Sequence, residues 1–116
     1  METPKTRIIQ ELVPGKQITL AHVIANPDPS IYKQFNEQTI NPNSAIGVLT
    51  ITPPETSIII ADISIKAAGV QVVSINKSSG SLIIAGTVAN VEAAIDSVLD
   101  YVKNKLGFEV CALTKT

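Results

Sequence analysis

The chain has 116 residues, with 10 acidic and 9 basic side chains and a formal net charge of −1. Charged residues make up only 16% and aromatic residues 3%, which excludes the basic, ring-bearing surface that nucleic-acid binding needs. No apolar run approaches the roughly 20 residues of a membrane span. The length suits one domain with one core. So little charge predicts that other subunits cover part of the surface, with an apolar monomer as the alternative.

The N-terminus and the reactive side chains exclude several further classes. Residues 1–7 contain no apolar stretch and so do not form a secretory signal. A single cysteine cannot form an internal disulfide, and both observations favour a cytosolic protein. Cys111 lies in an apolar strand and is predicted to be an inert buried thiol. His22 is the only histidine and is predicted to be a structural strand residue, because no zinc-ligand spacing accompanies it. We expect no metal and no cofactor.

The first elements along the chain are short. Residues 7–13 are predicted to be extended and to stop at Pro14 and Gly15, a pair that suits a type II turn. Residues 18–25 are β-branched and apolar, which predicts a strand. Residues 30–36 follow as a short helix, and residues 36–44 as a loop.

A strand over residues 45–52 leads into a predicted helix over residues 57–65. Thr52 and Glu55 have the spacing of a capping box, and Gly69 is predicted to close the helix as a C′ glycine. Asp62 and Lys66, one turn apart, should form a surface ion pair. The remaining faces of this helix are nearly all apolar, which predicts that it is covered on more than one side.

The last part of the chain predicts a hairpin, a long helix and a final strand. Strands over residues 70–75 and 81–85 are joined by a connection at residues 76–80. A second helix begins at Thr87, ends at Gly107 and precedes a strand over residues 108–114. Its apolar face comprises Val91, Ala94, Ile95, Val98, Val102 and Leu106. From residue 45 onward this order predicts an α+β, ferredoxin-like fold: an antiparallel sheet with helices on one face.

Three motifs then resemble those of a known family. Residues 65–70 read I-K-A-A-G-V and residues 77–80 read K-S-S-G, where bacterial microcompartment (BMC) shell proteins have L-K-A-A-N-V and K-I-G-S-G. Residues 22–27 read H-V-I-A-N-P, similar to the family's C-terminal H-V-I-P-R-P, but here they precede the other motifs. The chain therefore resembles the circularly permuted branch of BMC shell proteins, over almost its whole length.

The resemblance implies a non-enzymatic, homohexameric tile in the shell of a metabolic organelle. By analogy, Lys66 lies at the tile edge, and so does Asn26, where typical members have an arginine. The hairpin that lines the sixfold axis in typical members corresponds to Lys77, Ser78, Ser79 and Gly80.

The permuted branch is also expected to form a small β-barrel over the sixfold axis, with one strand from each subunit. That strand would comprise Arg7, Ile8, Ile9, Gln10, Glu11, Leu12 and Val13. Residues 1–15 would then be the barrel strand and turn, and residues 16–116 the BMC core, together one domain. The implied partners are further copies, other shell proteins of the same organelle and, at the barrel, an encapsulated protein. Ethanolamine, propanediol and choline utilisation are all compatible with the sequence.

Two other functions fit the residues less well. A ferredoxin-like module that senses a small molecule would show saturable ligand binding and threefold assembly. An enzyme would need a converging acid–base pair, for which the chain offers one histidine and scattered carboxylates. Among three hypotheses, the structural shell component is preferred.

Overall fold

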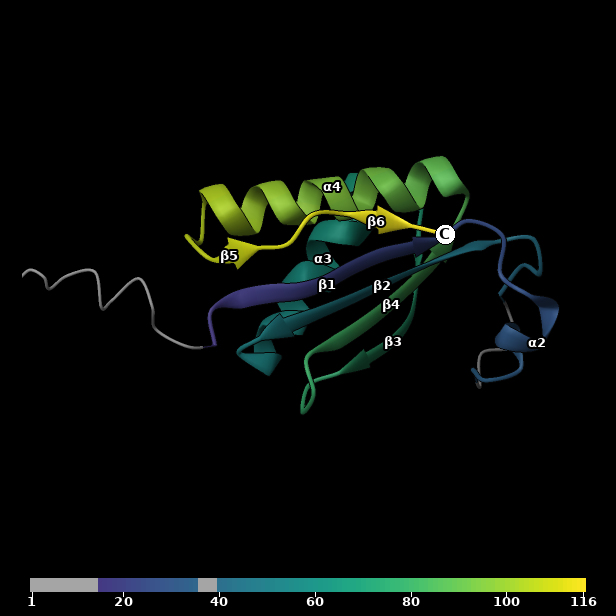
Figure 1. Cartoon of the computed structure of the whole chain (residues 1–116), viewed down its shortest axis with the longest axis horizontal. Helices are drawn as coiled ribbons and strands as arrows, with labels where there is room; N and C mark the ends of the chain where they lie inside the picture. The colour runs from purple at the N-terminus through teal and green to yellow at the C-terminus, as the bar shows by residue number, and fades with distance from the viewer. Residues whose placement is uncertain (1–14, 36–39) are drawn as a thin grey trace, which may run out of the picture.

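The structure is a computed structural model that describes residues 15–35 and 40–116. From the second strand onward the elements follow the predicted order, with the last strand in two pieces (Figure 1). The predicted strand at residues 7–13 lies outside the described residues. The elements are β1 (Gln17–Ile24), α2 (Pro29–Tyr32), β2 (Ala45–Thr52), the 3-10 helix η1 (Pro54–Thr56), α3 (Ser57–Ala67), β3 (Gln71–Asn76), β4 (Ser81–Gly86), α4 (Val88–Asn104), β5 (Glu109–Val110) and β6 (Thr114–Lys115).

The strands form one sheet in the order β3-β4-β2-β1-β5, and β6 also pairs with β1. The pairs among β1, β2, β3 and β4 are antiparallel, whereas β5 and β6 run parallel to β1. The prediction of a purely antiparallel sheet is therefore wrong at this edge. The reason is the crossover through α4, which returns the chain in the direction of β4. Because β4 and β1 point the same way, the returning segment is parallel to β1.

Helices α3 and α4 lie together on one face of the sheet, as predicted (Figure 1). The core between these layers is made of aliphatic side chains from both helices and from β1, β2 and β4. Gly47 of β2 faces α4, because a Cβ added there would lie 2.8 Å from Cγ1 of Val91 and 2.9 Å from Cγ1 of Ile84. A glycine at this position thus lets the helix approach the sheet closely.

The opposite face of the sheet is also partly apolar. Side chains alternate along a strand, so Val48, next to Gly47, points away from α4. Val48 pairs with His22 on one side and with Ile83 on the other, and the neighbouring Leu20 is 40% exposed. The described residues therefore leave apolar groups on this face partly exposed.

Helix α3 forms where predicted, but both of its predicted caps are wrong. Thr52 is still the last residue of β2, and its hydroxyl donates to the carbonyl oxygen of Gln17. The chain then passes through η1, and the residue at the N-cap of α3, Thr56, makes no side-chain cap hydrogen bond. At the other end the C-cap Ala68 is extended, and Gly69 does not adopt the left-handed conformation. Burial of the helix against the core, rather than capping, accounts for its formation.

Helix α4 begins at the predicted residue. The Thr87 hydroxyl accepts a hydrogen bond from the Asn90 N–H at 3.1 Å, and Gly107 ends the turn after the helix with φ +73°. The predicted apolar face is buried except for Leu106, which lies beyond the helix and is exposed. None of the described helices is long and apolar enough to cross a membrane.

Helix α2 has only four residues, fewer than predicted. The Asp28 carboxylate accepts hydrogen bonds from the Ser30 N–H at 2.9 Å and from the Ser30 hydroxyl at 2.8 Å. The Tyr32 hydroxyl donates to the carbonyl oxygen of Ser44 at 2.5 Å, which ties α2 to the start of β2. The described part of the predicted loop, residues 40–44, contains no helix or strand.

Candidate functional site

The hairpin between β3 and β4 contains the predicted axis loop. The Asn76 carboxamide oxygen accepts the N–H groups of Ser78 at 2.9 Å and Ser79 at 3.0 Å. The Gly80 N–H donates to the Asn76 carbonyl oxygen at 2.8 Å. Gly80 has φ +80°, and a Cβ there would lie 2.0 Å from the Ile51 carbonyl oxygen. The loop is therefore a fixed tip whose lysine and two serines are exposed.

The second candidate surface is the outer side of α3. Ile58, Ile59 and Ile65 are 49%, 46% and 54% exposed. A groove of about 400 Å³ separates this side of α3 from Tyr101 of α4. Exposed aliphatic groups gathered on one helix are typical of a surface that packs against another protein. Within residues 15–35 and 40–116, the predicted second cover of α3 is not present.

Lys66 lies at the C-terminal end of this surface. Its Nζ is 2.9 Å from Oδ2 of Asp62, and the two side chains are 74% and 60% exposed. The predicted ion pair is thus present, in an open position where solvent screens it. Both groups are accessible to a neighbouring molecule.

The structure brings the two predicted edge residues to the same end of the sheet. Asn26 is exposed and follows the end of β1, whose Ile24 pairs with Ile46 of β2. Lys66 precedes β3, whose first residue, Gln71, pairs with Ala85 of β4. Ala85 also pairs with Ile46, so Lys66 and Asn26 lie at the same end of the sheet. No hydrogen bond joins Asn26 and Lys66, and the axis hairpin lies at the opposite end of the sheet. The predicted barrel strand falls outside the described residues.

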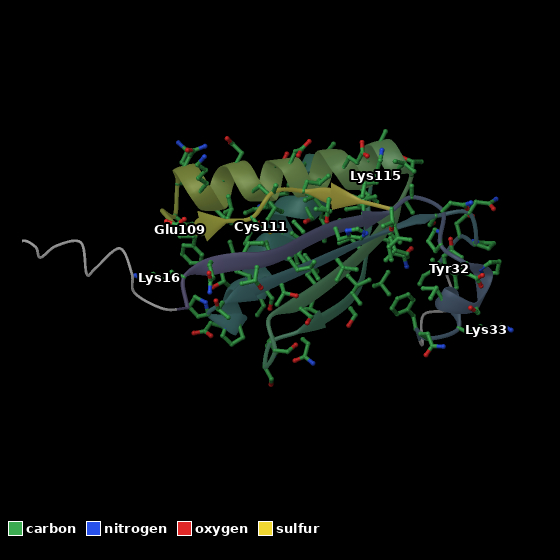
Figure 2. The ribbon with its side chains drawn as sticks, viewed as in Figure 1. Lys16, Tyr32, Lys33, Glu109, Cys111 and Lys115 are labelled. Atoms are coloured by element: carbon green, nitrogen blue, oxygen red, sulfur yellow. The ribbon has the colours of Figure 1, made fainter. Side chains whose placement is uncertain are left out.

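His22 binds the end of the chain, in keeping with its predicted structural role. Its Nδ1 is 2.6 Å from Oγ1 of Thr114, and its Nε2 is 2.9 Å from Oγ1 of Thr116. Cys111, between β5 and β6, is half-buried rather than buried (Figure 2). Within residues 15–35 and 40–116 there is no cluster of three His, Cys, Asp or Glu side chains able to hold a metal ion.

A second groove, of about 520 Å³, lies where the loop before β2 meets the start of β3 and the end of β4. Its lining contains asparagine, glutamine and hydroxyl side chains but no ionisable one, so it offers no acid–base chemistry. Nearby, hydrogen bonds from Ser30 lower the pKa of the Asp28 carboxyl, and burial raises the pKa of the Tyr32 hydroxyl. Both shifts accompany structural contacts of α2.

Comparison with known protein families identifies the family of the chain. A profile of the BMC domain matches residues 45–113, more than half of the chain. The chain belongs to the bacterial microcompartment shell proteins. The match begins at β2, so β1 and its H-V-I-A-N-P motif stand before the domain's usual start, which agrees with the circularly permuted branch.

Individual shell proteins match nearly the whole chain. The shell protein CutR of Streptococcus intermedius is 46% identical over 110 residues, covering 95% of this chain and 92% of CutR. The shell protein EutS of Salmonella typhimurium is 44% identical over 112 residues, covering 97% of this chain and 98% of EutS.

Solved structures of CutR match the fold. A flat CutR hexamer has a TM-score of 0.84 and 43% identity over 90% of this chain and 94% of that one. A CutR screw assembly has a TM-score of 0.80 and 43% identity over 89% of this chain and all of that one. CutR has also been solved as a domain-swapped dimer, with a TM-score of 0.63 and 42% identity over 88% of this chain and all of that one.

Membership in this family makes the chain a structural shell component and not an enzyme, as the sequence predicted. Sequence reasoning missed the pair of hydrogen bonds that joins His22 to Thr114 and Thr116, which we call the His22 clamp. The two threonines lie two residues apart, as residues on one side of a strand do. The apolar outer side of α3 was predicted from its isoleucine-rich sequence, but only the packing of α4 decides which isoleucines are exposed.

Proposed function

We propose that this BMC shell protein forms a homohexameric tile that packs with other tiles into a microcompartment shell. The observation that carries the proposal is the likeness of 90% of the chain to a protein solved as a flat hexamer, at a TM-score of 0.84. The exposed isoleucines of α3 and the partly apolar second face of the sheet support it. Both are surfaces that the described residues of one chain leave exposed and that a ring of subunits can bury.

The hairpin of Lys77, Ser78, Ser79 and Gly80 is assigned to the neighbourhood of the sixfold axis. Its support is rigidity: Asn76 fixes two backbone N–H groups, and only a glycine fits beneath the Ile51 carbonyl. Residues 7–13 are assigned to a barrel over that axis, as one strand of each subunit in a one-domain chain. A closed barrel leaves no free strand edge, and its outer surface is the proposed docking place for an encapsulated protein.

Lys66 and Asn26 are assigned to the tile edge, where the chain meets other shell proteins of the same organelle. A lysine with a flexible stem and an exposed ammonium group can lie along a neighbour and donate to its carbonyl oxygens. Asn26 has fewer donors than the arginine of typical members, so this edge contact is weaker. We further propose that, like CutR, the chain has access to flat and screw assemblies, because a head-to-tail interface gives a ring or a helix depending on whether its rotation closes.

Light scattering coupled to size-exclusion chromatography tests the tile. Six copies of a 12.3 kDa chain give about 74 kDa, and a single peak of that mass is the expected result. A broad mass that grows with concentration would indicate the screw form of the same interface. A monomer, dimer or trimer at all concentrations would overturn the hexamer, and a trimer would revive the ligand-sensing alternative.

A further inference from the structure

The polar groove of about 520 Å³ lies at the end of the sheet that also carries Lys66 and Asn26 (Figure 1). Its volume falls within the roughly 300–1,000 Å³ of small-molecule sites, which are lined mainly by apolar side chains. This groove is lined instead by amide and hydroxyl side chains, which come from Asn41, Asn43, Ser44, Gln71 and Thr87. None of its described lining residues is ionisable.

The wall formed by residues 41–44 is held by hydrogen bonds within the chain. The Asn41 carboxamide oxygen accepts the Asn43 N–H at 2.8 Å, and the Asn41 carbonyl oxygen accepts the Ser44 N–H at 2.9 Å. The Tyr32 hydroxyl donates to the Ser44 carbonyl oxygen. A ligand therefore meets a wall that is already ordered, which lowers the entropic cost of binding.

The side formed by the start of β3 and the end of β4 depends on two glycines. A Cβ on Gly86 would lie 3.2 Å from the Gly69 carbonyl oxygen and 3.4 Å from Cγ1 of Val70. A Cβ on Gly69 would lie 3.3 Å from Nδ2 of Asn90. The chain before β3 therefore lies close against the end of β4. The Gly69 carbonyl oxygen accepts a long bond of 3.4 Å from Nδ2 of Asn90, and its second lone pair can accept another.

Several polar groups of the lining are not used by the fold. Ser44 is only 9% exposed, yet its hydroxyl has no hydrogen-bond partner among the described residues. The Asn43 carboxamide and the Asn41 NH₂ group also make no bond within that part of the chain. The Thr87 hydroxyl accepts from the Asn90 N–H, which leaves its hydrogen free to donate. A buried hydroxyl without a partner is costly, so Ser44 points to a bound molecule.

The chemistry of the lining decides the charge of that molecule. A charged ligand would give up its water without gaining a counter-ion from any described lining residue. Amide and hydroxyl groups donate and accept, as the hydroxyls of a polyol do. We propose that this groove binds a small uncharged molecule with several hydroxyl groups, to which Asn43, Ser44 and Thr87 donate. The site goes beyond the shell function, because it uses neither the predicted axis loop nor the apolar side of α3.

Three probes with the same polyhydroxyl carbon chain separate charge from shape: sorbitol is uncharged, gluconate ends in a carboxylate and glucamine ends in an ammonium group. Each is titrated into the full-length protein in its native assembly, and carbon-13-labelled methyl groups are followed by NMR. The methyl groups of Val70 and Ala85 report on the groove that they line, and those of Val102 in the core report general solvent effects. We expect saturable shifts at Val70 and Ala85 alone, with sorbitol binding roughly fivefold or more tighter than either charged probe.

Variants of the lining test which groups bind the probe. Ser44→Ala removes the buried hydroxyl but keeps both backbone bonds of this residue, and should weaken sorbitol binding about threefold to tenfold. Ser97→Ala, on α4 and outside the lining, is the matched control and should leave the affinity unchanged. Asn43→Asp places a carboxylate in the lining and should make glucamine the tightest of the three probes.

Several results would overturn the proposal. These are the absence of a saturable shift, equal affinities for the three probes, or an unchanged affinity in Ser44→Ala. Shifts of equal size at Val102 would indicate a solvent effect and would have the same consequence. The mass of the assembly is measured separately, so a groove that binds no polyol leaves the proposed hexamer untouched.

Discussion

At the residue scale, the position of Gly80 requires both a positive φ and the absence of a Cβ, and only glycine among the amino acids meets both requirements. Its φ of +80° lies in the left-handed region, and the Ile51 carbonyl oxygen occupies the place of a Cβ. The N–H of Ile51 also donates to the Gly80 carbonyl oxygen at 2.9 Å. The tip of the axis hairpin is thus fixed to β2 through the backbone of one glycine.

Gly80→Ala is expected to lower the free energy of unfolding by about 3 kcal/mol or more, from the left-handed conformation plus the displaced backbone. Urea denaturation measures this effect. Gly15→Ala is the control, with positive φ but free space, and should cost about 1–2 kcal/mol. Equal losses in the two variants would show that the contact with Ile51 is unimportant.

Two buried serines of α3 offer a second comparison. The Ser64 hydroxyl donates to the Ile60 carbonyl oxygen at 2.8 Å, whereas the buried Ser57 hydroxyl has no hydrogen-bond partner among the described residues. An unsatisfied buried hydroxyl costs about 1–3 kcal/mol. We expect Ser57→Ala to stabilise the fold by about 1 kcal/mol and Ser64→Ala to be neutral or destabilising. Thermal unfolding of both variants is the measurement, and a loss of stability in Ser57→Ala would contradict the assignment.

At the scale of elements, capping decides the shortest helix. α2 has four residues, too few to be stable alone, and depends on Asp28 at its start and on Tyr32 at its end. The longer α3 forms without side-chain caps because four of its residues are buried in the protein. Local hydrogen bonds matter most where tertiary burial is least.

The Asp28 cap predicts a pH dependence for α2. The hydrogen bonds from Ser30 lower the folded-state pKa of this carboxyl below its ordinary value. The cap therefore stabilises α2 fully above the unfolded pKa of about 3.9, and this stabilisation is lost as the pH falls through the lower folded value. Amide hydrogen exchange of residues 30–34 should accelerate below about pH 4 beyond the intrinsic rate. Asp28→Asn keeps an acceptor oxygen without a titrating charge, and an identical acid response in that variant would contradict the prediction.

At the scale of the whole molecule, the predicted axis loop and the predicted edge residues lie at opposite ends of the sheet. The tip of the β3–β4 hairpin exposes Lys77, Ser78 and Ser79, whereas Lys66 and Asn26 lie at the other end. Apolar groups lie between them, on α3 and on the second face of the sheet. This separation suits a tile that has an axis, an edge and interfaces between subunits.

Lys66→Ala tests the edge without disturbing the fold, since its side chain is exposed and its ion pair with Asp62 is screened by solvent. We expect the hexamer mass and the unfolding curve to stay within error, while extended sheets seen by negative-stain electron microscopy decrease severalfold. Lys103→Ala, an exposed lysine on α4, is the control for charge. Unchanged sheets in the Lys66 variant would remove this residue from the edge.

The sequence determined the elements whose patterns are local. The alternation of apolar residues in β1, β2 and β4, the helical spacing from Val91 to Val102 and the Thr87 cap all depend on neighbours within a few positions. The family motifs likewise lie in short runs, so shell membership was predictable from them. Residues 7–13 lie outside the described residues, so the barrel stays a prediction.

The tertiary structure decided what depends on distant partners. β5 and β6 run parallel to β1 because α4 crosses over between β4 and β5, and the break between them at residues 111–113 follows from how the C-terminal segment meets β1. Thr52 does not cap α3 because it pairs with Gln17 of β1 as the last residue of β2. The clamp joins His22 to residues more than 90 positions away. Hydrophobic periodicity reports which face of an element is buried, but only the packed chain decides which backbone and side-chain groups are left to satisfy one another.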